Sequence, residues 1–179
     1  VILGIVYPLA ITLLAHLFFP RQAGGSLLRR GGEVIGSELI GQPFTSPAYF
    51  HPRPSAAGEG YDPTASGASN LGPTSKTLVD RVKSNLGHVL AENPNIAINR
   101  IPVDMVTASA SGLDPDISLA NAEFQVACVA GARRVSQDQV LCIISANTSG
   151  RQFGLLGEPR VNVLRLNLAL DAAFGSPPQ

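Results

Sequence analysis

The sequence has no tryptophan and only three tyrosines, so it offers few aromatic side chains on which nucleic acid bases or sugars could stack. It also has no net charge, because thirteen Lys and Arg residues balance thirteen Asp and Glu residues. This balance gives no case for binding nucleic acid or for polybasic attachment to a membrane. The two cysteines, Cys128 and Cys142, are too few and too far apart for a zinc site or a disulfide scaffold.

Charge is absent altogether from residues 1–19, which end at Pro20-Arg21. A helix of this length spans just under ~30 Å, about the hydrocarbon thickness of a bilayer. A signal peptide would need a basic start and a small-x-small cleavage site, neither of which is present, and a buried core helix is the other alternative. We therefore predict a transmembrane anchor at 1–20. Because the sequence does not begin with Met, we expect the anchor to be missing its first turn or two.

The rest of the chain suits one loop-rich soluble α+β domain at 21–174 and a tail at 175–179, since seventeen of the eighteen glycines and twelve of the fourteen prolines lie in it. Gly31-Gly32 between two short apolar runs predicts a hairpin. Residues 43–73 predict an ordered, partner-facing loop, because prolines exclude regular structure while Phe44, Tyr49, Phe50 and Tyr61 can pin it down.

Helices are predicted at three places. Residues 74–93 carry an apolar stripe at Leu78, Val82, Leu86 and Val89, with a stop at Asn93-Pro94. Asp114-Pro115 is typical of a helix start, and the buried face of that helix would comprise Ile117, Ala120, Phe124, Ala127 and Cys128. Ser136 and Gln139 predict a capping box for a third helix running to Asn147, with Gly150 at its exit.

Two strands complete the prediction. Residues 96–108 indicate a strand broken at Pro102. Residues 161–170 favour a strand, with a strand followed by a helix as the alternative. If the second and third helices form an antiparallel hairpin, Cys128 and Cys142 lie roughly level, so a disulfide could form in an oxidising compartment; two buried free thiols are the alternative.

Standard catalytic patterns are incomplete, so no catalytic or metal-binding residue is assigned. Residues 67–72 have the glycine spacing of a phosphate-binding loop, but Pro73 stands where that motif requires Lys, which favours a structural turn over an anion site. His51 and Ser55 are the remaining option for a nucleophile and its base, and give a second hypothesis, a membrane-anchored periplasmic hydrolase. Paired-carboxylate hydrolysis by Asp104, Asp114 or Asp116 is more remote.

Several strings nevertheless occur together in a distinctive order: YP at 7–8, GS at 36–37, LIGQ at 39–42, Phe50, RPSA at 53–56, SGASNLGP at 66–73, VTAS at 106–109, SGLDP at 111–115, LGEPRVNVL at 156–164 and LNLALD at 166–171. In this combination the chain resembles the KdpC family, the C subunit of the bacterial high-affinity potassium-transporting ATPase, over essentially its whole length. It departs at Asp116, where the family usually has His, and at Ser149, where an acidic residue is common. No role of that His can therefore be carried over.

The resemblance implies a non-catalytic accessory subunit that assembles with an ATP-hydrolysing P-type subunit, a channel-like potassium-binding subunit and a small membrane subunit. It implies a catalytic chaperone that raises the ATP affinity of the hydrolysing subunit. No cofactor would be bound tightly, because ATP and potassium are handled by the complex. Nucleic acid is not an expected partner.

The resemblance also bears on location and on the candidate residues. Arg21, Arg29 and Arg30 after the anchor would by themselves favour a cytoplasmic domain, whereas the family implies a single pass through the inner membrane and a periplasmic domain, which we adopt as the expectation. Tyr7 and Pro8 would help the anchor pack against other membrane helices. The candidate surface for partners and nucleotide affinity comprises Arg53, Ser66, Gly67, Ser69, Asn70, Asp114, Gln125 and Arg160. The plainer alternatives are a local salt bridge for Arg53, a turn-stabilising side chain for Asn70 and a solvated helix face for Gln125.

Overall fold

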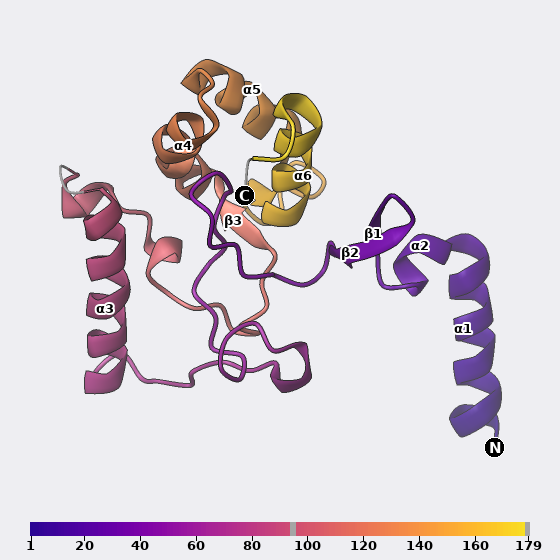
Figure 1. The fold of residues 1–179 in the computed structure, drawn as a ribbon. Helices are drawn as coiled ribbons and strands as arrows, with labels where there is room; N and C mark the ends of the chain where they lie inside the picture. The colour runs from indigo at the N-terminus through magenta and orange to yellow at the C-terminus, as the bar shows by residue number, and fades with distance from the viewer. Residues whose placement is uncertain (94–95, 178–179) are drawn as a thin grey trace. The chain divides into compact units, whose positions relative to one another are not determined.

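The computed structural model describes residues 1–93 and 96–177, and the chain divides into two compact units, residues 1–40 and 41–179. Both helices and strands are present, so the predicted α+β class is confirmed. The helix stop predicted at Asn93-Pro94 and the tail predicted at 175–179 each include residues outside the described ranges, at 94 and at 178–179. Figure 1 shows the elements of each unit.

The first unit begins with consecutive helical segments: η1 (Ile2–Val6), a π-helix, then α1 (Tyr7–Phe18) and the short α2 (Pro20–Ala23). Pro8 is the second residue of α1, directly after the π-helix η1, so the helical backbone continues through a residue that has no N–H to donate. The apolar side chains of η1 and most of those of α1 are exposed. Within the described part of the chain, no helix has both the length and the apolar character needed to cross a bilayer.

A hairpin completes this unit, as predicted. Strands β1 (Leu27–Arg30) and β2 (Glu33–Ser37) pair antiparallel. Gly31 and Gly32 have φ values of 60° and 91°, and a two-residue turn with positive φ at both positions matches the twist of the strands.

In the second unit, the long loop at 43–73 is ordered, as predicted, and contains only the short 3-10 helix η2 (Pro63–Ala65). The helix that follows, α3 (Lys76–Glu92), has the predicted stripe on its less exposed side, with Val89 fully buried. It begins two residues later than predicted, with Ser75 as the N-cap residue.

The predicted strand at 96–108 is wrong. The chain forms two single-turn helices there, η3 (Ile98–Arg100) and η4 (Val103–Met105). Pro102 lies between them and cannot donate to a strand ladder, and the neighbouring amides bond locally instead, Ile101 N to Ile98 O at 3.1 Å and Val106 N to Val103 O at 3.2 Å.

The predicted helix start at Asp114-Pro115 is also wrong. Asp114 Oδ1 accepts from the Asp116 amide at 3.0 Å in a local turn, and the chain then enters strand β3 (Asp116–Ser118). Helix α4 (Leu119–Arg133) begins afterwards, with the Ser118 side chain as its cap. This later start places a different face inward. Ala120, Ala127 and Cys128 are exposed and Phe124 is half-buried, while the buried set is Asn121, Ala122, Gln125, Val126, Val129 and Ala130.

Helix α5 (Gln137–Asn147) begins with the predicted capping box and packs on α4. It ends at Asn147, as predicted, and strand β4 (Thr148–Ser149) follows directly, so that Gly150 lies just beyond this strand. Strand β5 (Arg160–Asn162) comes next. The strand favoured for 161–170 is therefore wrong and its alternative is right, because helix α6 (Val163–Phe174) starts directly after β5. The Asn162 side chain accepts from the Arg165 amide at 3.1 Å and caps α6.

A three-stranded antiparallel sheet in the order β3-β5-β4 supports these three helices. The core lies between them, and Figure 1 shows α4, α5 and α6 gathered on one side of the unit. Phe50 from the long loop is completely buried in this core. The other core residues are Ile117, Ala122, Val126, Val129, Ala130, Val140, Ile144, Val161, Val163, Leu166 and Leu170. An irregular segment is thus as much a part of the core as the helices are.

Gly112 tests how closely the long loop packs on the turn before β3. We expect Gly112→Ala to lower the free energy of unfolding by about 2–4 kcal/mol. Its φ is +68°, and an added Cβ would lie 2.5 Å from the Ala57 nitrogen. Gly87→Ala in α3 is the matched control, because nothing lies within 4 Å of its Cβ, and should stabilise by about 0.5–1 kcal/mol. Urea unfolding of the purified chain followed by far-UV circular dichroism measures both, and equal effects would contradict this packing.

Candidate functional site

A cavity of about 620 Å³ in the second unit lies beside the start of β3 and is here called the Arg53 cavity. Three of the predicted site residues, Arg53, Asp114 and Arg160, line it. The other lining residues are Pro102, Val103, Asp104, Asp116, Ile117, Ser118, Ala120, Gly157, Glu158 and Pro159. Loop, 3-10 helix, strand and turn segments that are distant in sequence therefore meet at one place.

Arg53 is held on one side of this cavity by the long loop. Its Nη1 lies 3.1 Å from Asp114 Oδ2, and its Nη2 donates to the Ala108 carbonyl at 3.4 Å. Its Nε is buried and has no hydrogen-bond partner among residues 1–93 and 96–177. The alternative of a local salt bridge for Arg53 therefore describes its contacts correctly, although the Nε–H of Arg53 remains a donor without an acceptor among the described residues.

The second ion pair joins neighbouring strands. Arg160 Nε in β5 lies 2.9 Å from Asp116 Oδ2 in β3, and the Asn162 side chain donates to Asp116 Oδ1 at 3.3 Å. Burial raises the pKa of the Asp116 carboxyl above its usual value, and Arg160 and Asn162 offset this only in part. Asp116, noted from sequence as a departure from the family and as a remote candidate for paired-carboxylate hydrolysis, is thus part of the cavity wall.

The remaining acids of the cavity are also engaged. Asp104 accepts from the Ser118 amide at 2.9 Å, the Ser118 hydroxyl at 3.1 Å and the Asn121 side chain at 3.1 Å. Glu158 pairs with Arg151 at 2.7 Å. Each of the four carboxylates of this cavity, Asp104, Asp114, Asp116 and Glu158, therefore accepts hydrogen bonds or pairs with an arginine. Within the described ranges, no three His, Cys, Asp or Glu side chains are grouped to hold a metal ion.

Ser66 and Gly67 lie where the long loop meets the turn before β3. The Gly67 amide and the Ser66 hydroxyl both donate to the Ser111 carbonyl, at 2.9 and 3.0 Å. The glycine-rich stretch therefore uses its first amide inside the protein rather than for an anion, which supports the structural-turn interpretation. Asn70 has a φ of 49° and Ser69 precedes it in this turn, consistent with the turn-stabilising alternative for Asn70.

Gln125 lies away from the Arg53 cavity and is buried in α4. Its Oε1 accepts from the His51 amide at 2.7 Å, and its Nε2 donates to the His51 carbonyl at 3.0 Å. The solvated-face alternative for Gln125 is therefore wrong. It also lines two smaller cavities of about 350 and 180 Å³ between the loop, α3 and α4. The candidate surface predicted from sequence is thus divided among three places.

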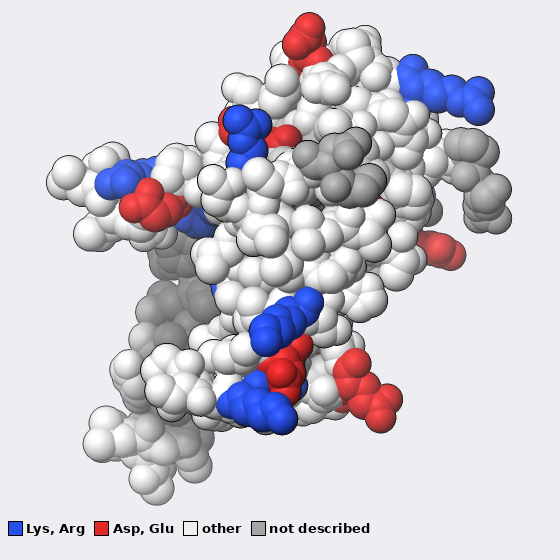
Figure 2. All heavy atoms as spheres, turned by 90° about the vertical axis from the view of Figure 1, so that its left-hand side faces the viewer, with Lys and Arg blue, Asp and Glu red and all other residues white. Residues whose placement is uncertain are grey.

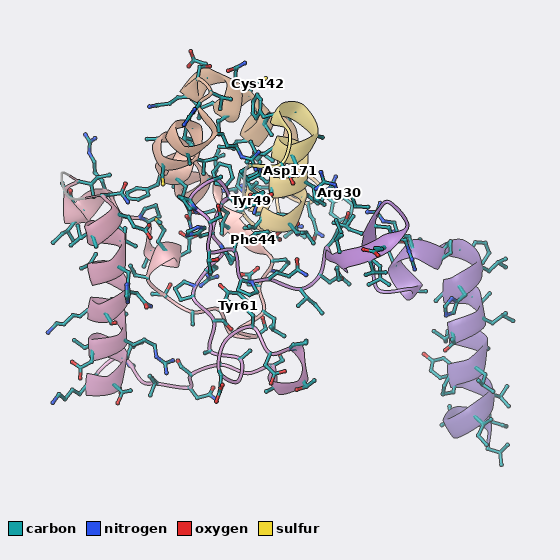
Figure 3. All side chains as sticks on the ribbon, in the orientation of Figure 1. Arg30, Phe44, Tyr49, Tyr61, Cys142 and Asp171 are labelled. Carbon is teal, nitrogen blue, oxygen red and sulfur yellow. The ribbon has the colours of Figure 1, made fainter. Side chains whose placement is uncertain are left out.

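Sequence reasoning missed a buried polar cluster between the loop and α6. Arg133 Nη2 and Asp171 Oδ1 lie 2.9 Å apart with side chains only 2% and 6% exposed, and the Tyr49 hydroxyl donates to Asp171. Figure 3 shows Tyr49 and Asp171 close together beside α6. Burial and the Asp171 carboxylate raise the pKa of Tyr49. A helical reading of 163–174 would have placed the polar Asn167 and Asp171, four residues apart, on one helix face. It would not have identified Arg133 and Tyr49 as the partners of Asp171, because both are distant in sequence.

Both cysteines are free thiols, and both residues are exposed, so neither a disulfide nor a pair of buried thiols is present. Figure 3 shows Cys142 on α5. The hydrolase pair is not assembled either. The Ser55 hydroxyl donates to the Gly112 carbonyl at 2.6 Å, whereas His51 Nε2 lies 3.1 Å from the Ser46 carbonyl. A serine whose proton is directed to a backbone carbonyl lacks the adjacent base that activates a nucleophile.

Known proteins resemble this chain along nearly all of its length. The family model described as "K+-transporting ATPase, c chain" (KdpC) matches residues 1–172. The chain is 57% identical to a potassium-transporting ATPase KdpC subunit of Koribacter versatilis over 177 residues, which cover 99% of this chain and 90% of that protein. Proteins of the same description from Myxococcus xanthus and Rhodospirillum rubrum are 55% and 56% identical, with 99% and 96% of this chain covered and 84% and 88% of theirs.

The Gln125 clamp gives a stability prediction. Gln125→Ala should lower the free energy of unfolding by about 1–3 kcal/mol, because it leaves the part-buried His51 N–H and C=O without their side-chain partners. Gln137→Ala at the exposed start of α5 is the control and should change it by less than about 0.5 kcal/mol. The measurement is urea unfolding of the purified chain, and similar values for the two variants would contradict the clamp.

Asp116 gives a pH-dependent prediction. Because the folded-state pKa of Asp116 is raised, ionising it costs stability, and this cost is present above the folded pKa and disappears as the pH falls below the unfolded value of about 3.9. The stability of Asp116→Asn relative to the natural chain should therefore rise as the pH increases from about 3.5 to 7. Urea unfolding of both chains across this range measures the difference, and an advantage that instead grows toward acid would contradict the assigned shift.

Proposed function

The chain belongs to the KdpC family, the c chain of K+-transporting ATPases, and from this membership we propose that it is a non-catalytic accessory subunit of a bacterial potassium pump. It would assemble and stabilise the complex and raise the ATP affinity of the hydrolysing subunit. ATP and potassium would be handled by the complex, with no cofactor held tightly by this chain.

The observation that carries the non-catalytic role is the pairing inside the Arg53 cavity. Its four carboxylates are bound to arginines, amides or a hydroxyl, as described above: the Arg53–Asp114 pair joins the long loop to the turn before β3, and the Arg160–Asp116 pair joins β5 to β3. A surface of this kind suits recognition of another protein, because fixed ion pairs orient and select a partner without taking part in a reaction.

We propose that the long loop and the turn before β3 form the main contact with the other pump subunits: a P-type subunit that hydrolyses ATP, a channel-like subunit that binds potassium and a small membrane subunit. The loop and turn are joined by the Ser55–Gly112 and Gly67–Ser111 bonds and by the Arg53–Asp114 pair. Because these contacts fix the surface before any partner arrives, little conformational entropy would be lost on assembly.

Residues 1–20 are proposed as a single-pass anchor in the inner membrane. The exposed apolar side chains in this stretch support the proposal, because such a surface needs either lipid or another helix to cover it. Tyr7 and Pro8 would lie on its packing surface. The following domain is proposed to lie in the periplasm, so any effect on ATP affinity would pass through the partner subunits.

Assembly and activity test the proposed role. The complex purified with this chain should show potassium-stimulated ATP hydrolysis. The complex prepared without it should need a several-fold higher ATP concentration for its half-maximal rate, because weaker binding of ATP raises the KM for ATP. Steady-state hydrolysis across a range of ATP concentrations measures this. ATP hydrolysis by the isolated chain would refute the non-catalytic role, and unchanged ATP dependence would refute the effect on affinity.

The exposed thiol of Cys142 tests the location of the domain. In the Cys128→Ser chain, a membrane-impermeant maleimide added to intact spheroplasts should label Cys142, because a periplasmic thiol is open to the medium. Gel-shift analysis measures labelling, with detergent-permeabilised spheroplasts as the control. Labelling only after permeabilisation would place the domain in the cytoplasm.

A further inference from the structure

A small hairpin at residues 151–158, here called the apolar knob, projects between β4 and β5. Gln152 and Leu156 form an antiparallel bridge, with each amide donating to the other carbonyl at 2.8 and 2.9 Å. At the base of the hairpin, Arg151 Nη2 contacts both carboxylate oxygens of Glu158, at 2.8 and 2.7 Å. The knob is therefore a closed, preformed turn.

The tip of this turn carries apolar side chains that nothing in the described chain covers. Phe153 is 93% exposed, Leu155 80% and Leu156 61%. Phe153 also has a φ of 54°, in the left-handed region that a β-carbon disfavours, so the turn itself would be better served by glycine or asparagine. Neither packing in this chain nor turn geometry accounts for phenylalanine at this position.

We propose that the apolar knob inserts into an apolar pocket of another protein subunit of the pump. This inference rests on the proposed function, because it requires partner subunits. Aromatic side chains such as Phe are enriched in the cores of protein–protein interfaces, and an aromatic anchor contributes affinity when it is desolvated in a matching pocket. The backbone bridge at the base means that little order has to be acquired on binding.

The charges around the knob favour a protein pocket over a lipid surface. Segments that lie on anionic lipids present free Lys or Arg beside their apolar residues. Here Arg151 is paired with Glu158, and the next cation, Arg160, is paired with Asp116. Figure 2 shows one face of the molecule, the left-hand side of Figure 1, and on that face basic and acidic side chains are interspersed. The knob is thus a neutral, convex, apolar feature.

The knob is continuous with the Arg53 cavity. Gly157, Glu158 and Arg160, at and just beyond its base, line that cavity. One partner surface could therefore receive the knob and cover the cavity at the same time, with the apolar tip supplying affinity and the fixed ion pairs setting orientation.

Recovery of the complex tests this proposal. With all pump subunits expressed in the same cells, the chain carrying Phe153→Asp should recover at least about tenfold less partner subunit in a detergent pull-down than the natural chain, since a charge cannot enter an apolar pocket. Ile98→Asp is the matched control, because Ile98 is also apolar, 62% exposed and in the same unit. It should recover the natural amount. Far-UV circular dichroism of the purified chains checks that both variants fold.

A photo-crosslinker identifies what the tip touches. Benzoylphenylalanine in place of Phe153, irradiated in the assembled complex, should yield a covalent adduct with another pump subunit. Adducts only with lipid or with a second copy of this chain would overturn the proposal, as would undiminished recovery by a folded Phe153→Asp chain. If the natural chain itself recovers no partner subunits, both the proposed function and the knob proposal fall.

Discussion

The second unit depends on how it satisfies the backbone of an irregular loop that passes through its core. Phe50 is fully buried without belonging to any strand, so its peptide groups cannot be paired in a ladder. Two side-chain amides take that place: Asn167 of α6 bonds the Phe50 N–H and C=O at 2.8 and 3.0 Å, and Gln125 of α4 does the same for His51. A primary amide can do this because it carries a donor and an acceptor side by side. The helices and the loop therefore fold as one body.

The candidate site follows from this constraint. Once residues 50 and 51 are fixed between α4 and α6, the loop leaves the core in a set direction, and Arg53 meets Asp114 three residues after Phe50. The buried Arg133–Asp171 pair with Tyr49 secures the same loop from the other side. Residues that would be mobile in a free loop become a fixed wall of the Arg53 cavity. A rigid wall of paired charges, with an apolar knob at its edge, is what an assembly subunit can offer to its partners.

Local patterns were reliable at three places where a local interaction decides the structure. The Gly31-Gly32 turn, the Ser136–Gln139 capping box and the apolar stripe of α3 were predicted because each depends on residues within a few positions of one another. The errors have two sources. Residues 116–118 became a strand because the distant β5 pairs with them, and 163–174 became a helix whose buried residues at 163, 166, 167, 170 and 171 follow helical spacing. The strand predicted at 96–108 failed for a local reason, since the amides around Pro102 bond within single turns. Arg53, Asp114 and Arg160 could be selected from the family resemblance, but their meeting at one cavity could not.

The sequence alone determined the family, the mixed α+β character and the apolar segment at the start of the chain. These properties reside in the order of the residues and their composition, and need no knowledge of which segments touch. Only the tertiary structure decided that Gln125 is a buried clamp rather than a solvated side chain, that Asp116 and Asp104 join the cavity, and that Phe153 is left outside at the tip of a closed turn. The reason is physical: hydrogen-bond partners far apart in sequence, and the exposure left after packing, are properties of the assembled chain and of no local stretch of it.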